Sequence, residues 1–139
     1  MTQRYYFDTS IWRDYYENRE DNFRPLGEWA FRLIQKIIET RDIILYSDTL
    51  PKELSIDFSF NEIGKILEIA TSKGALQKAS ISENQKKEAA ILSKNRGVSY
   101  CDALHAVLAR DYEAILVARD NHFLQLTDIT IAKKPEELI

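Results

Sequence analysis

The sequence contains few of the residues that mark disulfide-rich, disordered or membrane-spanning proteins. Its 139 residues include one cysteine, Cys101, which excludes an internal disulfide and a cysteine-rich zinc site. It has four glycines and three prolines, which argues for closely connected elements rather than a linker-rich chain. No hydrophobic run approaches the ~20 residues of a membrane-spanning helix. We therefore expect a single domain over residues 1–139 that is intracellular, in the cytoplasm, and does not enter a membrane.

The charge of the chain gives no overall attraction to nucleic acid, because the formal net charge is -3 at pH 7. A nucleic-acid substrate is still compatible with this charge, since a local basic patch suffices for phosphate contacts and bound cations offset acidic residues. The residues available for such a patch are Lys86, Lys87, Lys94, Arg96, Arg110 and Arg119. Dispersed cations of this kind are more often an ordinary solvated face.

Hydrophobic periodicity predicts strands that alternate with helices. Strands are expected at 4–8, 42–46, 75–81 and 114–118, with an edge strand at 129–132. Helical spacing, capping patterns and the positions of proline and glycine predict helices over 26–40, from about 48 onward, 60–72, 82–95 and 99–111. Residues 133–139 are expected to form a C-terminal tail. The alternation predicts an α/β fold, with a central parallel sheet of four to five strands and helices on both faces.

Two acidic residues, Asp8 and Asp120, end the two most apolar of the predicted strands. In parallel sheets, ligands bind beyond the carboxyl ends of the strands, where the strand order reverses. Glu53 and Asp102 fall in the first turns of predicted helices, whose N-termini belong at the same edge. Four carboxylates gathered there would repel one another, and a hard cation such as Mg²⁺ or Mn²⁺ is the obvious compensation.

Each of these acids also has a purely structural explanation. Asp8 and Asp120 could cap the turns that follow them, and Asp102 could complete a capping box with Ser99. Glu53 could gain roughly 0.3–1 kcal/mol from a helix dipole. Taken singly, the structural and functional explanations are about equally good. Taken together, capping does not explain why two acids end the most apolar strands while the others open helices at the same edge.

Other acids are weaker candidates for the site. An exposed, charged segment accounts well for Asp14, Glu17, Glu20 and Asp21. Asp57 lies one helical turn from Glu53 and is a secondary candidate, whereas Asp111 and Glu113 lie at the far end of their helix.

The two histidines lie far apart in the sequence, so a zinc centre is a poor interpretation. His105 follows Asp102 by three residues and shares its helical face. It could support the acids from behind, contact RNA, or simply pack beneath the site. His122 is more typical of a surface turn.

Four parts of the chain carry a recognisable combination of motifs. They are Tyr6-Phe7-Asp8-Thr9-Ser10, Glu53, Ser99-Tyr100-Cys101-Asp102-Ala103-Leu104-His105-Ala106 and Leu116-Val117-Ala118-Arg119-Asp120-Asn121-His122-Phe123. This combination resembles the PIN-domain ribonucleases, and most closely the VapC-type toxins of bacterial and archaeal toxin–antitoxin pairs. The resemblance spans residue 4 to about residue 132. The order and spacing of the four acids give it most of its specificity.

The resemblance implies a three-layer PIN-like fold and an endoribonuclease that hydrolyses RNA with Mg²⁺ or Mn²⁺. It implies that Asp8, Glu53, Asp102 and Asp120 are the catalytic residues. Of these, Asp8, Asp102 and Asp120 would bind metal, and Glu53 would orient or activate the attacking water. Ser10 matches a small polar position that steadies the first acid. The resemblance further implies a small protein antitoxin and a homodimer.

Residues 12–24 depart from the resemblance, because this segment is longer and more acidic than the usual VapC pattern. Its aromatic residues, Trp12, Tyr15, Tyr16 and Phe23, suit base stacking, a cover over the core, or a partner surface. The alternative to an enzyme is a catalytically silent PIN scaffold that binds RNA or a protein partner. The presence of all four acids argues against that alternative.

Overall fold

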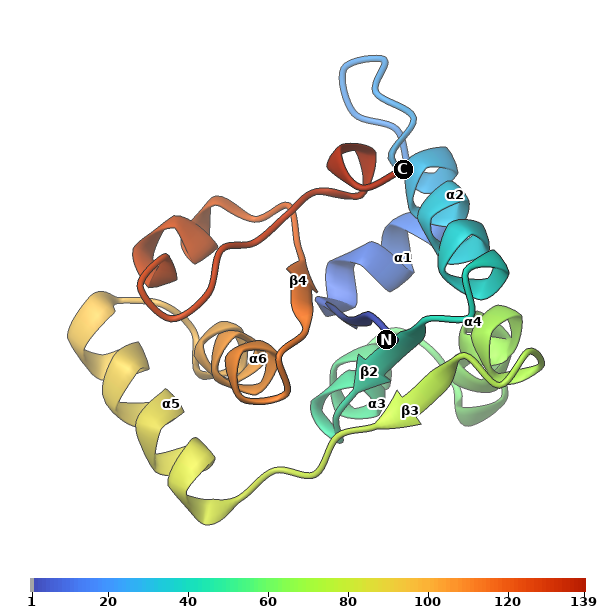
Figure 1. Ribbon diagram of the computed structural model, residues 1–139. Helices are drawn as coiled ribbons and strands as arrows, with labels where there is room; N and C mark the ends of the chain where they lie inside the picture. Colours follow the sequence, from blue (N-terminus) through green and yellow to red (C-terminus); the bar gives the residue numbers. More distant parts are fainter. Residues whose placement is uncertain (1) are drawn as a thin grey trace.

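A parallel sheet of four strands forms the centre of the computed structural model, which describes residues 2–139 (Figure 1). The strands are β1 (Arg4–Phe7), β2 (Ile43–Tyr46), β3 (Leu76–Lys78) and β4 (Ile115–Val117), in the order β3-β2-β1-β4. Tyr6 of β1 aligns with Leu45 of β2 and with Leu116 of β4. The strands predicted near 4–8, 42–46, 75–81 and 114–118 are therefore confirmed.

Helices cover both faces of the sheet (Figure 1). One face carries α1 (Thr9–Glu17), α2 (Leu26–Glu39), α3 (Thr49–Leu54) and α4 (Phe60–Thr71), and the other carries α5 (Glu83–Arg96) and α6 (Tyr100–Asp111). Two short 3₁₀ helices, η1 (Asn121–Leu126) and η2 (Pro135–Glu137), follow β4. Across residues 2–139, no helix has both the length and the apolar character that crossing a membrane requires. The expected three-layer α/β fold is confirmed.

Alternate residues of each strand build the two cores. On β1, Tyr5 and Phe7 pack with the helices α1 to α4, whereas Tyr6 packs with α5 and α6. Ile44 and Leu45 of β2 divide between the two faces in the same way. Because both faces are buried, these strands are nearly continuous apolar runs in the sequence.

Local capping sets the ends of α5 as the sequence predicted. Ser82 Oγ accepts a hydrogen bond from the Gln85 N–H, and the Gln85 side chain accepts one from the Ser82 N–H. The helix ends at Gly97, whose φ of 67° lies in the left-handed region that favours glycine.

A close approach of α1 and α2 makes a second glycine necessary. A Cβ at Gly27 would lie 2.5 Å from Asn18 Cα and 2.7 Å from the Asp14 carbonyl oxygen. No real side chain tolerates these distances, so only glycine lets the two helices pack here.

The aromatic residues of segment 12–24 divide between core and surface. Trp12 is fully buried, and Tyr15 stacks on an aromatic ring of α2. Tyr16 packs edge-on against Phe58, whereas Phe23 is fully exposed. Covering the core is therefore the role of Trp12 and Tyr15, and Phe23 is left for contacts outside the domain.

The prediction of an edge strand at 129–132 is wrong. A single bridge joins Lys133 to Val117, with hydrogen bonds from the Lys133 N–H to Leu116 O (2.8 Å) and from the Ala118 N–H to Lys133 O (3.0 Å). The next N–H of a parallel ladder would come from Pro135, which has none to donate. The pairing therefore stops after one residue.

The segment expected to be a C-terminal tail, 133–139, packs against α2. Lys36 Nζ donates to Leu138 O at 2.6 Å, and the guanidinium of Arg119 makes two 2.8 Å bonds to the Glu136 carboxylate. These contacts hold η2 on the same face of the sheet as α1 and α2 (Figure 1).

Candidate active site

The strand order brings Asp8 and Asp120 to one edge of the sheet. After β1, the chain adds β2 and β3 on one side and then crosses to add β4 on the other. This reversal is where α/β sheets bind ligands. Asp8 directly follows β1, and its N–H donates to Val117 O at the end of β4 (2.9 Å). Asp120 lies three residues beyond that strand end.

Asp8 belongs to a buried part of this edge, and its residue is 6% exposed. Ser10 Oγ donates to Asp8 Oδ2 at 2.6 Å, and His105 Nε2 lies 3.7 Å from Asp8 Oδ1. Within residues 2–139, the carboxylate makes no helix-cap hydrogen bond, although its backbone stands at the N-cap of α1. Burial raises the pKa of Asp8, and the contacts with His105 and Ser10 only partly offset that rise. Capping therefore does not account for this acid.

Glu53 reaches the same place from α3, but not from a first turn. The helix is six residues long and Glu53 is next to its last, so the expected stabilisation by the helix dipole is wrong. Thr9 Oγ1 and His105 Nε2 lie 2.8 Å and 3.1 Å from Glu53 Oε1. Burial opposes ionisation, but the contacts with His105 and Thr9 outweigh it and hold the pKa of Glu53 below its ordinary value.

His105 joins these two acids, and we call Asp8, Glu53 and His105 the inner group. The histidine residue is 1% exposed. Its Nε2 faces the two carboxylates, and its Nδ1 lies 2.9 Å from the Tyr6 hydroxyl. Of the roles that the sequence left open, support from behind the acids fits this geometry, since a buried imidazole cannot contact RNA directly.

Asp102, Asp120 and His122 lie on the solvent side of the inner group, and we call them the outer group. One ligand atom from each lies within 4.8 Å of the others. His122 Nδ1 is 3.1 Å from Asp120 Oδ1 and 3.6 Å from Asp102 Oδ2. Burial and the negative charges of Asp8 and Asp120 raise the pKa of Asp102. Asp102 is therefore close enough to Asp8 for their charges to interact.

The capping explanation holds for one outer acid and not for the other. Ser99 Oγ accepts a hydrogen bond from the Asp102 N–H at 3.0 Å, but in the described chain the Asp102 carboxylate returns none to the Ser99 backbone. Asp120 does cap η1, because its Oδ1 accepts from the His122 N–H at 2.8 Å. The carboxylate of Asp102 is therefore left available to the site.

His122 was missed as a site residue by the sequence reasoning. It does lie at the surface, where its side chain is 65% exposed, but its imidazole faces Asp102 and Asp120. The signal that could have revealed it is its spacing from Asp120. A capping aspartate accepts from the N–H two residues later and so brings that residue over its own carboxylate.

Two other acids lie outside both groups. Asp14 is buried in α1, with its carboxylate 3.8 Å from the guanidinium of Arg19 and 4.0 Å from that of Arg119, and burial raises its pKa. Its assignment to an exposed charged segment is wrong, because α1 continues to Glu17 and turns Asp14 inward. Asp57 is exposed and pairs with Arg13 at 2.6 Å, and Arg13 also donates to the Glu53 carbonyl at 3.0 Å.

Of the six basic residues, Arg119 is mostly buried, with a side chain that is 13% exposed, and so does not belong to a solvated face. Several of them pair with acids of their own: Lys86 with Glu83, Arg96 with Asp128, Arg110 with Glu88, and Arg119 with Glu136.

The donor atoms of the site fit a divalent cation. Four carboxylates dominate the set, and oxygen donors are those that Mg²⁺ and Mn²⁺ prefer. Two atoms that bind one ion at about 2.1 Å lie at most about 4.2 Å apart. His122 Nδ1 lies within this limit of both outer acids, at 3.1 Å from Asp120 Oδ1 and 3.6 Å from Asp102 Oδ2.

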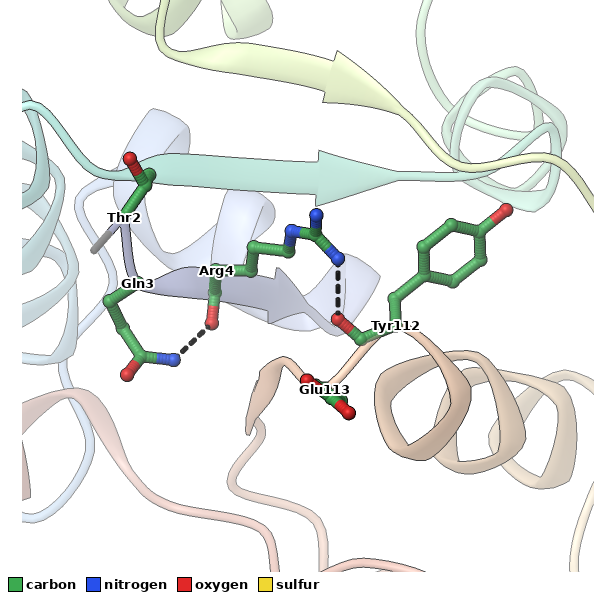
Figure 2. A pocket seen from close by; sticks show the side chains of 5 residues that line it. All are labelled: Thr2, Gln3, Arg4, Tyr112 and Glu113. Atoms are coloured by element: carbon green, nitrogen blue, oxygen red, sulfur yellow. Dashed lines mark hydrogen bonds between the residues drawn. The ribbon is translucent and has the colours of Figure 1, made fainter.

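A hollow of about 270 Å³ lies at the opposite edge of the sheet, where β1 begins (Figure 2). It is lined by Thr2, Gln3, Arg4, Tyr112 and Glu113. The Arg4 guanidinium donates to the Tyr112 carbonyl at 3.0 Å. Glu113 is the one carboxylate in the lining of this hollow, so the hollow lacks the set of metal-binding oxygens found where β1 and β4 end. Glu113 was expected to lie away from the site.

Comparison with known proteins agrees with this geometry. The family model described as PIN domain matches residues 5–129 of the chain. No curated protein matches the sequence. Among solved structures, the chain resembles a crystal structure of VapBC2 from Rickettsia felis bound to a DNA fragment from their promoter. The identity is 18%, the match covers 95% of this chain and 98% of that chain, and the TM-score is 0.67. The structural likeness shows a shared fold, and the family match establishes that this chain belongs to the PIN-domain family.

Proposed function

We propose that this chain is a metal-dependent endoribonuclease that hydrolyses RNA phosphodiester bonds, and that it is the toxin of a type II toxin–antitoxin system. The observation that carries the proposal is the convergence of four carboxylates from separate elements at the reversal of strand order. Burial raises the pKa of both Asp8 and Asp102, so keeping them there costs stability. A fold that retains such a cluster has a use for it, and holding a cation is that use.

Asp8, Asp102 and Asp120 would hold Mg²⁺ or Mn²⁺, with His122 beside them. A bound divalent ion lowers the pKa of its water, orients the scissile phosphate and stabilises the charge on the leaving oxygen. Ser10 fixes the rotamer of Asp8 by donating to one carboxylate oxygen, so that the other oxygen faces the site.

Glu53 would take the proton from the attacking water. Its lowered pKa keeps it ionised at neutral pH, and its two neighbours, Thr9 and His105, fix the position of Oε1 while leaving Oε2 for the water. Attack by water also distinguishes this reaction from transfer through the RNA 2′-hydroxyl, since only the latter produces a cyclic phosphate.

Cleavage of a mixed RNA pool tests the proposal. The wild-type protein is compared with Asp8→Asn and Asp111→Asn, each with Mg²⁺, Mn²⁺ or EDTA. We expect cleavage that requires metal, is lost in Asp8→Asn and is retained in Asp111→Asn, because Asp111 ends α6 at the opposite end from Asp102 and pairs with Arg110 and Gln85. Products without a cyclic phosphate support hydrolysis.

If the protein binds RNA equally well before and after Asp8→Asn, and does not cut RNA with any of the metals, it is a silent scaffold instead. Any co-purified protein must first be stripped away, because a bound partner could mask the site.

The toxin assignment rests on the family and on the fold shared with the VapBC2 structure, and it implies a small protein antitoxin. Induced expression of the chain alone is expected to arrest bacterial growth, and Asp8→Asn to relieve the arrest. We also propose a homodimer in the cytoplasm, which light scattering after size exclusion would contradict by finding only monomer at high concentration.

A further inference from the structure

A chain of buried hydroxyls leads from the sheet into the inner group. Thr49 Oγ1 lies 2.6 Å from Ser47 Oγ, which lies 2.8 Å from the Tyr6 hydroxyl. The Tyr6 hydroxyl lies 2.9 Å from His105 Nδ1, and His105 Nε2 lies 3.1 Å from Glu53 Oε1. Tyr6, Ser47 and His105 are each at most 1% exposed. Such a chain is costly to bury unless every member is satisfied.

The chemistry of the donors fixes one end of this chain. A carboxylate can only accept hydrogen bonds, so the imidazole nitrogen beside Glu53 must carry a hydrogen. The other ring nitrogen, Nδ1, is then the one that meets Tyr6. Burial raises the pKa of Tyr6, so its hydroxyl keeps its own hydrogen at neutral pH.

We propose that Tyr6 is a positioning residue for the cleavage reaction: its hydroxyl holds His105 Nδ1 and thereby keeps the His105 Nε2–H on Glu53. Without this contact, nothing on the sheet side would hold the ring in the orientation that places the Nε2–H against the carboxylate. Glu53 would then lose one of the two neighbours that fix Oε1. The roles of His105 and Glu53 rest on the proposed nuclease function, whereas the tautomer does not.

The neighbouring residue on β1 provides a matched control. Tyr5 is also a buried tyrosine, but it packs with the opposite core, away from His105. Tyr6→Phe and Tyr5→Phe therefore remove the same atom from the same strand, on opposite faces of the sheet.

Nitrogen NMR of the imidazole rings gives a readout that does not depend on activity. The chain has only two histidines, so tag-free protein labelled with ¹⁵N gives two rings to assign. At mildly alkaline pH, we expect His105 to carry hydrogen on Nε2 in the wild type and in Tyr5→Phe. Tyr6→Phe is expected to shift both His105 nitrogens. A wild-type Nε2 without hydrogen, or an unchanged His105 spectrum in Tyr6→Phe, overturns the proposal.

Kinetics then separate positioning from folding. In Tyr6→Phe, kcat is expected to fall about tenfold, the usual scale when a residue that supports a site residue is lost. KM is expected to stay within about twofold of the wild-type value. RNA affinity measured in EDTA should not change. A fall in Tyr5→Phe of the same size would show that the loss reflects packing, and would overturn the role of Tyr6.

Ser47→Ala keeps the test decisive if Tyr6→Phe does not fold. It removes the other partner of the Tyr6 hydroxyl and leaves the contact with His105 in place. The Nε2–H of His105 is expected to persist. Its loss would show that the whole series of hydrogen-bonded hydroxyls, rather than Tyr6 alone, holds the imidazole ring. A wild type with the expected tautomer but no nuclease activity would overturn the proposed function and leave the structural role of Tyr6 intact.

Discussion

The inner and outer groups of the site are held in place by different means. The inner acids each have a neutral hydroxyl donor, Ser10 for Asp8 and Thr9 for Glu53, and His105 lies between them. The outer acids lie closer to solvent, and the only imidazole beside them in the described chain is largely exposed. Hydrogen bonds within the fold therefore fix the positions of the inner side chains, whereas we expect a bound cation to fix those of the outer side chains.

Glu53 and Asp102 differ in the energetics of ionisation, whereas Asp8 of the inner group shares the raised pKa of Asp102. Hydrogen bonds lower the pKa of Glu53 in spite of burial, whereas burial and neighbouring charges raise the pKa of Asp102. Metal-assisted hydrolysis needs a base that is already ionised and positioned, as Glu53 is, beside carboxylates whose negative charge favours a cation, as at Asp102. Substitutions in the two groups should therefore fail in different ways.

The largest effect is expected for Asp8→Asn, because Asp8 belongs to the inner group and is also coupled by charge to Asp102. The loss of a metal ligand removes several kcal/mol of transition-state stabilisation, which corresponds to at least about a 10³-fold lower rate. Initial rates of RNA cleavage over a range of Mn²⁺ concentrations measure it. If high Mn²⁺ restored full activity, Asp8 would act like an outer residue and the comparison would be wrong.

Glu53→Gln and Asp102→Asn should separate the two groups most clearly. In Glu53→Gln, kcat is expected to fall about 10²–10⁴-fold, as for a general base, while the Mn²⁺ concentration for half-maximal rate stays the same. In Asp102→Asn, that Mn²⁺ concentration should rise strongly. Equal shifts in the metal requirement of both variants would contradict the division of roles.

A smaller effect is expected for His122→Asn. The side chain is exposed and lies beside two stronger ligands, so we expect about a tenfold loss of activity that added metal largely recovers. Mn²⁺ titration of the wild type, followed by NMR, should broaden the His122 signals first. Broadening of His105 without His122 would place the ion in the inner group alone.

Short-range sequence patterns predicted the fold and the edge of the sheet at which Asp8 and Asp120 lie. Apolar runs that end in Asp8 and Asp120, together with the Ser82 capping box, need only residues that are adjacent or one helical turn apart. The same patterns misplaced an edge strand at 129–132, where the apolar residues suit a strand but the Ile129 and Thr130 N–H groups both donate to Leu126 O in the turn after η1.

Contacts between distant residues were beyond such patterns. Thr9 and His105 approach Glu53 from 44 and 52 residues away, and neither spacing follows from helix or strand geometry. The burial of Asp14 depends on how α1 packs in the tertiary structure. The places of Asp8 and Asp120 after strands could therefore be predicted from the sequence, whereas the position of Glu53 in its helix and the partners that set its pKa could not.

The smallest effect concerns stability, and it should have opposite signs for Asp102 and Glu53. Asp102 has a raised pKa, so the folded protein binds its proton more tightly and the ionised form is destabilising above that raised pKa. Metal-free Asp102→Asn should thus be more stable than wild type at neutral pH, by about 1 kcal/mol or ~3 °C in Tm. This gain should shrink as the pH falls through the raised pKa towards the ordinary value near 3.8.

Glu53 has a lowered pKa, so its stabilising contribution is present above the ordinary value of 4.5 and is lost as the pH falls through the lowered pKa. Glu53→Gln should therefore be less stable than wild type at neutral pH. Thermal melts in EDTA between about pH 4 and pH 8 measure both differences, and the same sign in both variants would contradict the opposite pKa directions of these two acids.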